Sequence, residues 1–430
     1  MFKHKKIYVI PIIGFFMMIL IISFLLKSEL TNNNQITYID ALYESTSMIT
    51  ATGSTVINIS EQFNTLGEFI VLIAMEIGAI GFMSFFSIMF MISKKKLKLS
   101  DTIFLSNEVN SNNYKTLKEK AKKITRYTII IEFFGAWLLA FRFVPMYGIK
   151  LGLWYSIFHS VSAFCNVGAG LFGNNSLTQF NNDTYVNMVF IVLMFLGSLG
   201  YFVTEDLVAY FCTAKKNKIH TETKLILVVS IFIIILGTVL IKLFDPGFTV
   251  LNSLFYTVTA RNSGFYTIDL SNVSEINKFL LMIIMFIGGG PGSNAGGIRV
   301  VVFAVLILTT ISNLKNDDNV VIFYKTISDK MVKKAITILS IDILIVLVGC
   351  FMLYITDPNG VLELMFFVIS LFSNTGLDII DMNALSFAGK IICIFVMYIG
   401  RIAPITLVSL FVPTESKSRG IKYPNMDIVL

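Results

Sequence analysis

Eight stretches of the chain are apolar over about 20 residues or more, the length that an α-helix needs to cross a bilayer. They lie near residues 7–26, 67–92, 125–145, 185–211, 225–244, 276–311, 335–355 and 387–412. A shorter, partly apolar stretch follows every other one of them, near residues 37–52, 152–167, 250–263 and 361–375. These four are too short to cross, and we interpret them as re-entrant segments. The pattern predicts an all-α polytopic membrane protein with eight spans.

The composition supports the same class of protein. Apolar residues make up 55% of the 430 positions, charged residues only 14%, and the mean hydropathy is +0.77. Water-soluble domains carry roughly 25% charged residues to cover their surface. A soluble globular fold, a disordered chain and a coiled coil are therefore excluded. The four cysteines are far apart and form no C-x-x-C pair, so we expect neither a disulfide nor a metal site from them.

The distribution of charge predicts the orientation in the cell (plasma) membrane. Ten Lys and Arg residues lie between residues 93 and 126, and smaller basic groups lie in the other loops on the same predicted side. Because Lys and Arg accumulate in cytoplasmic loops, we expect both termini of this multi-pass chain in the cytoplasm. The re-entrant segments would then open outward. Acidic residues collect on the outer side and would raise the local cation concentration, among them Asp40, Glu44, Asp183, Asp378 and Asp381.

One unit occurs four times along the chain. The re-entrant segments end in the sequences TATG, CNVG, RNSG and SNTG, which close on Gly53, Gly168, Gly264 and Gly376. The next span carries Met-x-(Ile/Leu)-Gly 24 to 29 residues further on, at Gly78, Gly197, Gly288 and Gly400. Two patterns at a near-constant offset predict four tandem copies of a span, a re-entrant helix with its loop, and a second span. The predicted repeats are residues 1–98, 99–215, 216–315 and 316–430.

Four outward-opening loops can surround one central pore with pseudo-fourfold symmetry. A monovalent cation that enters the membrane loses water at a cost on the order of tens of kcal/mol, which closely spaced backbone carbonyls can offset. Glycine permits the backbone angles that such carbonyls require, and the short helix before each loop would direct its negative end at the pore. The alternative is that these glycines only let helices pack closely. We favour close packing for the Met-x-x-Gly glycines.

The sixth span is interrupted at residues 288–297 by six glycines, Pro291, Ser293, Asn294 and Ala295. Such a run cannot stay α-helical, and a broken helix at membrane depth is tolerated where it lines a cavity. A structural kink is the alternative. The run also fits a loose G-x-G-x-x-A nucleotide pattern, which we discard because no strand precedes it.

Three segments resemble the Ktr/Trk/HKT superfamily of potassium transporters. They are Ala163–Gly168, Thr259–Phe265 and, as the most specific, Gly288–Val300. The resemblance extends over nearly the whole chain, to Arg401–Pro404. Eight spans without an extra N-terminal pair look more like the membrane subunit of a Ktr system than the longer Trk subunit.

The resemblance implies roles for the loop residues. A potassium selectivity filter would be formed by Thr52, Gly53, Asn166, Val167, Gly168, Asn262, Ser263, Gly264, Asn374, Thr375 and Gly376. Glycine at all four filter positions points to potassium, since relatives with Ser at the first tend to conduct sodium. An intramembrane gate below the filter would be formed by Gly288, Gly289, Gly290, Pro291, Gly292, Ser293, Asn294, Ala295, Gly296 and Gly297.

Charged side chains inside predicted membrane segments need partners. We expect Arg401 to border the cavity and to donate to carbonyls of the 288–297 loop, with a structural ion pair as the alternative. Arg261 is expected to brace its pore helix, and His159 to be a packing residue. Glu76 stands where the other repeats have aromatic residues; it either pairs with an intramembrane arginine or is a local variation.

These features predict a protein that admits potassium down its electrochemical gradient, with a sodium- or ammonium-conducting member of the superfamily as the alternative. An enzyme would need convergent titratable groups or a metal site, and the chain contains no H-E-x-x-H and no G-x-S-x-G sequence. A scaffold would not need four equivalent loops. We therefore expect no enzymatic activity, no cofactor in this chain, potassium as the transported ion, and no nucleic-acid partner.

The resemblance also implies partners. Ktr membrane subunits form homodimers on a cytoplasmic ring of nucleotide-binding regulatory subunits, so nucleotides would bind to that partner. We expect the basic loop from Lys94 to Arg126 to contact the ring. The positive-inside rule or attraction to lipid headgroups would explain the same charges.

Overall fold

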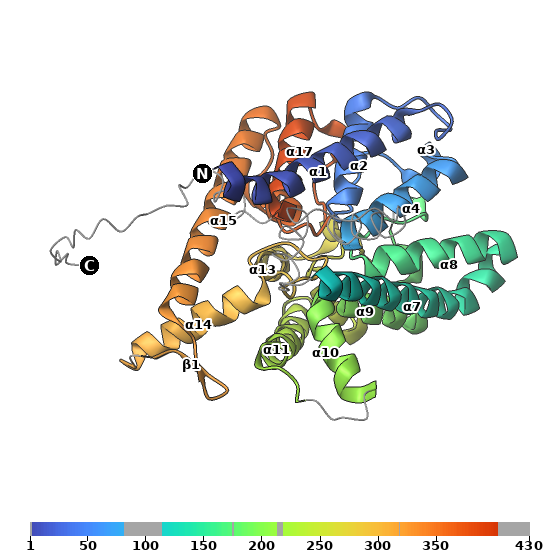
Figure 1. The fold of residues 1–430 in the computed structure, drawn as a ribbon. Coiled ribbons are helices and arrows are strands. Elements are labelled where there is room, and N and C mark those ends of the chain that lie inside the picture. The colour runs from blue at the N-terminus through green and yellow to red at the C-terminus, as the bar shows by residue number, and fades with distance from the viewer. Residues whose placement is uncertain (1, 81–113, 174–175, 213–217, 318, 403–430) are drawn as a thin grey trace.

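The first half of the chain contains two helical groups with the same order of elements. The computed structural model describes residues 2–80, 114–173, 176–212, 218–317 and 319–402 (Figure 1). The first group is α1 (Phe2–Lys27), α2 (Tyr38–Ile49), α3 (Ile59–Gln62) and α4 (Thr65–Ile80). The second group is α7 (Tyr114–Tyr147), α8 (Ile149–Phe164), η2 (Thr178–Phe180), α9 (Thr184–Leu199) and α10 (Tyr201–Cys212).

The second half repeats this order twice. The third group is α11 (Thr221–Phe244), α12 (Val250–Thr259), η3 (Leu270–Asn272), α13 (Glu275–Ile287) and α14 (Val300–Leu314). A hairpin of β1 (Val321–Ile322) and β2 (Lys325–Thr326) leads to the fourth group, which is α15 (Asp329–Thr356), α16 (Val361–Phe372), η4 (Met382–Ala384) and α17 (Phe387–Ile402). In Figure 1, α17 lies beside α1 and α2, so the last group is next to the first.

Each predicted re-entrant segment contains a short helix. The N-termini of two of them are capped in the same way, because Thr37 before α2 and Thr249 before α12 each accept a hydrogen bond from a backbone N–H three residues later. Among the described helices, α11, α15 and residues 122–147 of α7 are long and apolar enough to cross a membrane, and the bent pair α9 and α10 makes a fourth candidate. The eight crossings stay a prediction, and residues 81–92 and 403–412 of the predicted spans lie outside the described residues.

The predicted span at residues 185–211 is not one straight helix. The chain bends by 103° between α9 and α10, and Gly200 at the bend has a φ of +88°. Glycine adopts this left-handed conformation without a Cβ clash, and it ends the helix. Gly200 also packs against the 288–297 loop, since a methyl group in its place would lie 2.4 Å from the carbonyl oxygen of Pro291. The helix therefore breaks at the residue that contacts the 288–297 loop.

The predicted interruption of the sixth span is confirmed. Helix α13 ends at Ile287 and α14 begins at Val300. Gly288, Gly292 and Gly297 all have a positive φ, which no α-helix accommodates.

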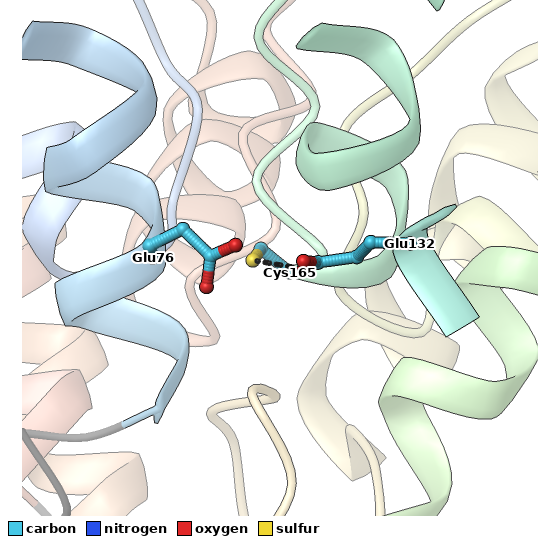
Figure 2. Close-up of side chains that lie close together, drawn as sticks. All are labelled: Glu76, Glu132 and Cys165. Atoms are coloured by element: carbon cyan, nitrogen blue, oxygen red, sulfur yellow. Dashed lines mark hydrogen bonds between the residues drawn. The ribbon is translucent and has the colours of Figure 1, made fainter. Parts of the chain in front are cut away.

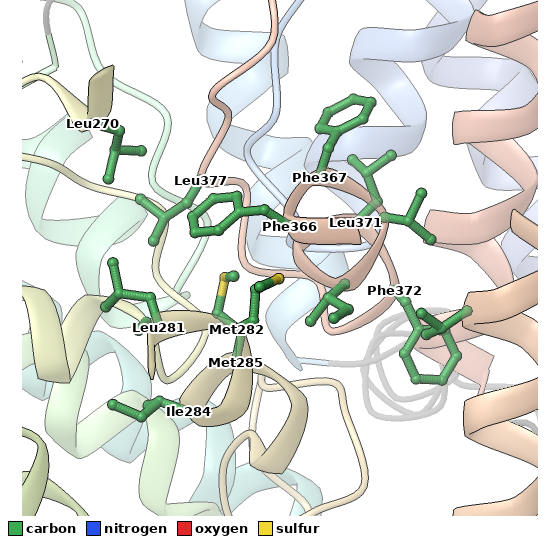
Figure 3. Packing of buried hydrophobic residues seen from close by; sticks show 14 of the residues in the cluster. Leu270, Leu281, Met282, Ile284, Met285, Phe366, Phe367, Leu371, Phe372 and Leu377 are labelled. Atoms are coloured by element: carbon green, nitrogen blue, oxygen red, sulfur yellow. The ribbon is translucent and has the colours of Figure 1, made fainter. Parts of the chain in front are cut away.

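The largest buried apolar cluster joins the third and fourth groups. Figure 3 shows Met282 and Met285 of α13 facing Phe366 of α16. Around the outside, α7, α11 and α15 expose large apolar side chains such as Phe133, Phe232 and Phe351. An apolar exterior of this kind suits a helix that faces lipid.

Three of the Met-x-x-Gly glycines lie against the ends of the short helices. A methyl group at Gly78, Gly197 or Gly400 would lie 1.9 to 2.3 Å from the carbonyl oxygen of the last residue of α2, α8 or α16, respectively. The close packing predicted for these three glycines is therefore confirmed. In the third group Gly288 has a different role, because it ends α13 and contacts the carbonyl of Gly296.

Substituting Gly400 by alanine is expected to destabilise the protein. The added methyl group would clash with the backbone of Phe372 at 1.9 Å, and overpacking of this kind costs about 1–3 kcal/mol. The thermal unfolding midpoint of the purified protein in detergent should fall. Gly247→Ala is the matched control, because nothing lies within 4 Å of that position. Equal midpoints for the two variants would contradict the packing argument.

Candidate ion-conduction site

The four loops after the short helices share an unusual backbone. In each loop the glycine and the residue two positions before it have a positive φ, and these pairs are Ala51 and Gly53, Asn166 and Gly168, Asn262 and Gly264, and Asn374 and Gly376. Alanine rarely adopts this conformation, whereas asparagine adopts it more readily than most residues other than glycine. The residue between each pair is not in the left-handed region. The four loops thus repeat one alternating conformation at equivalent positions.

The four loops meet in a closed ring. Each glycine lies against the carbonyl oxygen of the residue that precedes the next glycine in the ring. A methyl group at Gly53 would lie 1.5 Å from the Val167 oxygen, and one at Gly168 would lie 2.2 Å from the Ser263 oxygen. A methyl group at Gly264 would lie 2.4 Å from the Thr375 oxygen. One at Gly376 would lie 2.0 Å from the Thr52 oxygen, which closes the ring. No residue with a side chain fits at these four positions.

The polar side chains of the ring are buried and face protein partners. Asn374 Nδ2 donates to Thr52 Oγ1 at 2.9 Å and to the carbonyl oxygen of Met397 at 3.0 Å. With its amide oriented to satisfy both of its polar atoms, Asn166 Nδ2 donates to Ser263 Oγ and to the carbonyl oxygen of Met194. Their second acceptors, Met194 and Met397, are the methionines of two Met-x-x-Gly sequences. These asparagines fasten their loops to the neighbouring loop and to the following helix.

Asn262 joins two loops in the same manner. Its Nδ2 donates to the carbonyl oxygen of Ser373, which also accepts a hydrogen bond from Gly296 N at 3.1 Å. The carbonyl oxygen of Ser373 in the fourth loop therefore joins the third loop and the interrupted sixth span. All of the predicted filter residues lie in or beside the ring, and the asparagine side chains stabilise its shape.

The 288–297 loop lies against the ends of two short helices. Asn294 Nδ2 donates to the carbonyl oxygen of Phe164, the last residue of α8, at 3.2 Å. Gly290 N donates to the carbonyl oxygen of Ser198 at 2.9 Å. With the hydrogen bond to Ser373, these contacts attach the loop to the second and fourth groups. The ten predicted gate residues thus form one segment packed beside the ring.

Arg401 connects this loop to the first group. Its guanidinium donates to the carbonyl oxygens of Asn294 and Gly78. The predicted hydrogen bond from Arg401 to the 288–297 loop is therefore confirmed, and the contact with α4 is additional. Arg261 is almost fully buried, and its Nη2 donates to Ser230 Oγ on α11 at 3.0 Å. That contact agrees with the bracing role expected for Arg261.

A cavity of about 340 Å³ lies at the ring, lined by all four ring glycines. Asp378 and Asp381 also line it. The other outer acids contribute less free charge than expected, because Asp40 pairs with Lys390 at 2.7 Å and Asp183 with Arg142 at 2.6 Å. Glu44 is not on the surface: it is fully buried, and its Oε1 accepts a hydrogen bond from Val56 N at 2.8 Å.

Glu76 contacts another acid. Figure 2 shows Glu76 of α4, Glu132 of α7 and Cys165 pointing toward one another, with their ligand atoms within 4.8 Å of one another. Cys165 Sγ donates to Glu132 Oε1 at 3.6 Å, whereas Glu76 Oε2 is buried without a hydrogen-bond partner among the described residues. The expected ion pair between Glu76 and an arginine does not occur among the described residues, and a local variation at Glu76 stays a prediction. Glu132 was not expected at this site, although it is visible in the sequence as an acid inside an apolar span.

His159 has the packing role predicted for it. Its ring is fully buried, stacks on Phe172 with centroids 4.2 Å apart, and accepts a hydrogen bond from Leu171 N at 3.2 Å. A second buried acid was missed, Asp342 of α15, whose charged neighbour is Arg299 directly before α14.

Comparison with known proteins agrees with this geometry. The family model TrkH, described as cation transport protein, matches residues 11–419. The potassium/sodium uptake protein NtpJ of Enterococcus hirae is 32% identical over 91% of this chain and 90% of that protein. The Ktr system potassium uptake protein B of Bacillus subtilis is 32% identical over 97% of this chain and 95% of that protein.

A solved structure has the same fold. The crystal structure of the potassium transporter TrkH from Vibrio parahaemolyticus matches with a TM-score of 0.72. The match covers 88% of this chain and 79% of that chain, at 20% sequence identity.

The contact between Glu76 and Glu132 generates a stability prediction. Glu132→Leu would leave the buried Cys165 thiol without its acceptor and would place an apolar group against the Glu76 carboxyl, which costs about 1–3 kcal/mol. Glu132→Gln keeps a donor and an acceptor and should stay close to the unmodified protein. Thermal unfolding of both variants in detergent would measure the difference. A Leu variant as stable as the Gln variant would show that the contact contributes nothing.

Proposed function

The chain belongs to the TrkH family of cation transport proteins, and from this premise we propose that it takes up potassium ions through the ring of four loops. The observation that carries the proposal is the closed contact of the four ring glycines with the carbonyl oxygens of their neighbours. Two relatives that match nearly the whole chain are named as potassium uptake proteins, one of them for sodium as well. Uptake, and not enzymatic turnover, is the activity that these similarities support.

In this proposal the ring is the selectivity filter. The carbonyl oxygens of Thr52, Val167, Ser263 and Thr375 replace the water that the ion loses. The short helices α2, α8, α12 and α16 end at the ring, so their partial negative charge favours a cation. The buried asparagine and hydroxyl groups hold neighbouring loops at a constant spacing. A cytoplasm at negative potential then draws the ion inward by about 2.3 kcal/mol per 100 mV.

We place the ring in a fourfold membrane architecture. Four repeats of a span, a re-entrant helix and a second span cross the membrane eight times around one axis, with both termini in the cytoplasm. The recurring order of helices and the cyclic contacts among the loops support this arrangement. The large apolar side chains exposed on α7, α11 and α15 fit a lipid-facing exterior.

The 288–297 loop is the gate of this pathway. It is anchored to the ends of α8 and α16 and to Arg401, so it crosses from one group to another directly beside the filter. Glycine-rich backbone can exchange these hydrogen bonds for others at low conformational cost. Arg401 stabilises the closed arrangement and repels cations while the loop is in place.

Regulation would come from a second subunit. Relatives named as parts of a Ktr system support a partner subunit, and we propose that it is a cytoplasmic nucleotide-binding ring that carries a homodimer of this chain. Nucleotides would then bind only to that ring. The basic residues Lys94, Lys95 and Lys96, proposed to contact it, lie outside the described residues.

Sodium conduction is the second candidate function, favoured by the likeness to NtpJ.

Gly53→Ser is expected to make the filter permeable to sodium. The new side chain would meet the Val167 carbonyl at 1.5 Å, so the ring must widen or lose that oxygen. Fluxes of rubidium, potassium, sodium and ammonium into proteoliposomes measure the effect. Gly173→Ser is the matched control, because Gly173 has a similar φ of +79° but no atom closer than 3.7 Å.

Three outcomes of this flux measurement are decisive. Selective rubidium and potassium flux that is lost only in Gly53→Ser supports the filter. Equal sodium flux through the unmodified protein would establish the second candidate function. Unchanged selectivity in Gly53→Ser would contradict the assignment of the filter to the ring.

Arg401→Ala is expected to raise potassium flux. The substitution removes the charge-assisted hydrogen bond to the 288–297 loop, worth about 1.5–3 kcal/mol, and the one that holds Arg401 to α4, so flux should rise on the order of tenfold or more. Arg401→Lys, which keeps the charge and some donor capacity, should have a smaller effect. Unchanged or lower flux at a normal protein level would contradict the gating role.

A further inference from the structure

We propose that the outer mouth of the ring contains a binding site for a partly dehydrated monovalent cation, with the Asp378 carboxylate as its charged ligand. The site rests on the proposed function, since the bound ion would be the next to enter the filter. It differs from the filter in chemistry. The filter offers neutral carbonyl oxygens, whereas this site offers a carboxyl group from only one of the four loops.

Asp378 lies directly outside the ring. It follows the ring glycine Gly376 by two residues, and it lines the 340 Å³ cavity together with all four ring glycines. The equivalent positions in the other loops are Thr55, Gly170 and Tyr266, none of which is charged. The fourfold pattern of the ring is therefore broken by one carboxylate at its mouth.

The carboxylate is held in place from one side only. Asp378 Oδ2 accepts a hydrogen bond from Ser54 Oγ at 2.9 Å, and Ser54 Oγ is 2.8 Å from the Tyr43 hydroxyl. Ser54 belongs to the first loop, so this contact joins the fourth loop to the first. Asp378 Oδ1, in contrast, is buried and has no hydrogen-bond partner within the part of the chain that the structure describes. A buried carboxylate oxygen without a donor is unfavourable, and a cation in the cavity would stabilise it.

Neighbouring charges do not neutralise this position. Asp40 and Asp183 are occupied by Lys390 and Arg142, whereas neither Asp378 nor Asp381 has an ion-pair partner among the described residues. Asp381 also lines the cavity, but its Oδ1 already accepts a hydrogen bond from Asn383 N at 3.0 Å. The negative charge of the cavity therefore comes from these two residues, and Asp378 is the closer of them to the ring along the chain.

The test is the isosteric variant Asp378→Asn, with Asp381→Asn as the control. The amide introduced by Asp378→Asn keeps an oxygen that can accept from Ser54 Oγ, so the ring should hold its shape. We expect the KM for rubidium uptake into proteoliposomes to rise about three- to tenfold at low external salt, with Vmax within about twofold and selectivity unchanged. Asp381→Asn should raise the KM less.

A second measurement is independent of transport. Ba²⁺ has a higher charge than potassium and should bind more tightly at the same carboxylate, so calorimetric titration of the purified protein with Ba²⁺ should show weaker binding in Asp378→Asn. An unchanged KM with unchanged Ba²⁺ affinity would overturn the site. A loss of Vmax without a change in KM or Ba²⁺ affinity would also overturn it, because that result belongs to a structural brace. Ba²⁺ binding through Asp378 in a protein without rubidium uptake would support the site and overturn the proposed function.

Discussion

The contact between each ring glycine and a carbonyl oxygen of the neighbouring loop is the constraint on which the rest of the structure depends. Four loops can approach this closely only where no side chain intervenes, and only where the backbone at two positions of each loop is left-handed. Every surrounding feature helps to keep that arrangement. The asparagines attach each loop to its neighbours, and the packing of Gly78, Gly197 and Gly400 lets a second helix support the end of a short one.

The asymmetry of the molecule comes from its third group. There the helix after the loop is interrupted, and the freed segment packs beside the ring against the second and fourth groups. Gly200 bends the second group at the same place, where Tyr201 N donates to the carbonyl oxygen of Gly292 at 3.3 Å. Arg401 completes the set of contacts from the fourth group. This glycine-rich segment thus contacts the second and fourth groups directly and is linked to the first group through Arg401.

The repeating features could be predicted from the sequence because they follow from local chemistry. The loop glycines, the short helices before them and the break at residues 288–297 all depend on residue types at regular spacing. The bend at Gly200 could not, because a single glycine in an apolar helix is tolerated and only the contact with Pro291 reveals its role. The proximity of Glu76 to Glu132 depends on helices distant in the chain, and no local pattern encodes it.

In the proposed mechanism, the transported ion binds to the carbonyl oxygens of Thr52, Val167, Ser263 and Thr375. Anomalous diffraction from crystals of the protein grown in rubidium tests it most directly, because rubidium replaces potassium with little change in size and can be located by its own signal. A rubidium peak is expected on the axis of the ring, in contact with those four oxygens. A ring without rubidium, in a protein that transports rubidium, would contradict it.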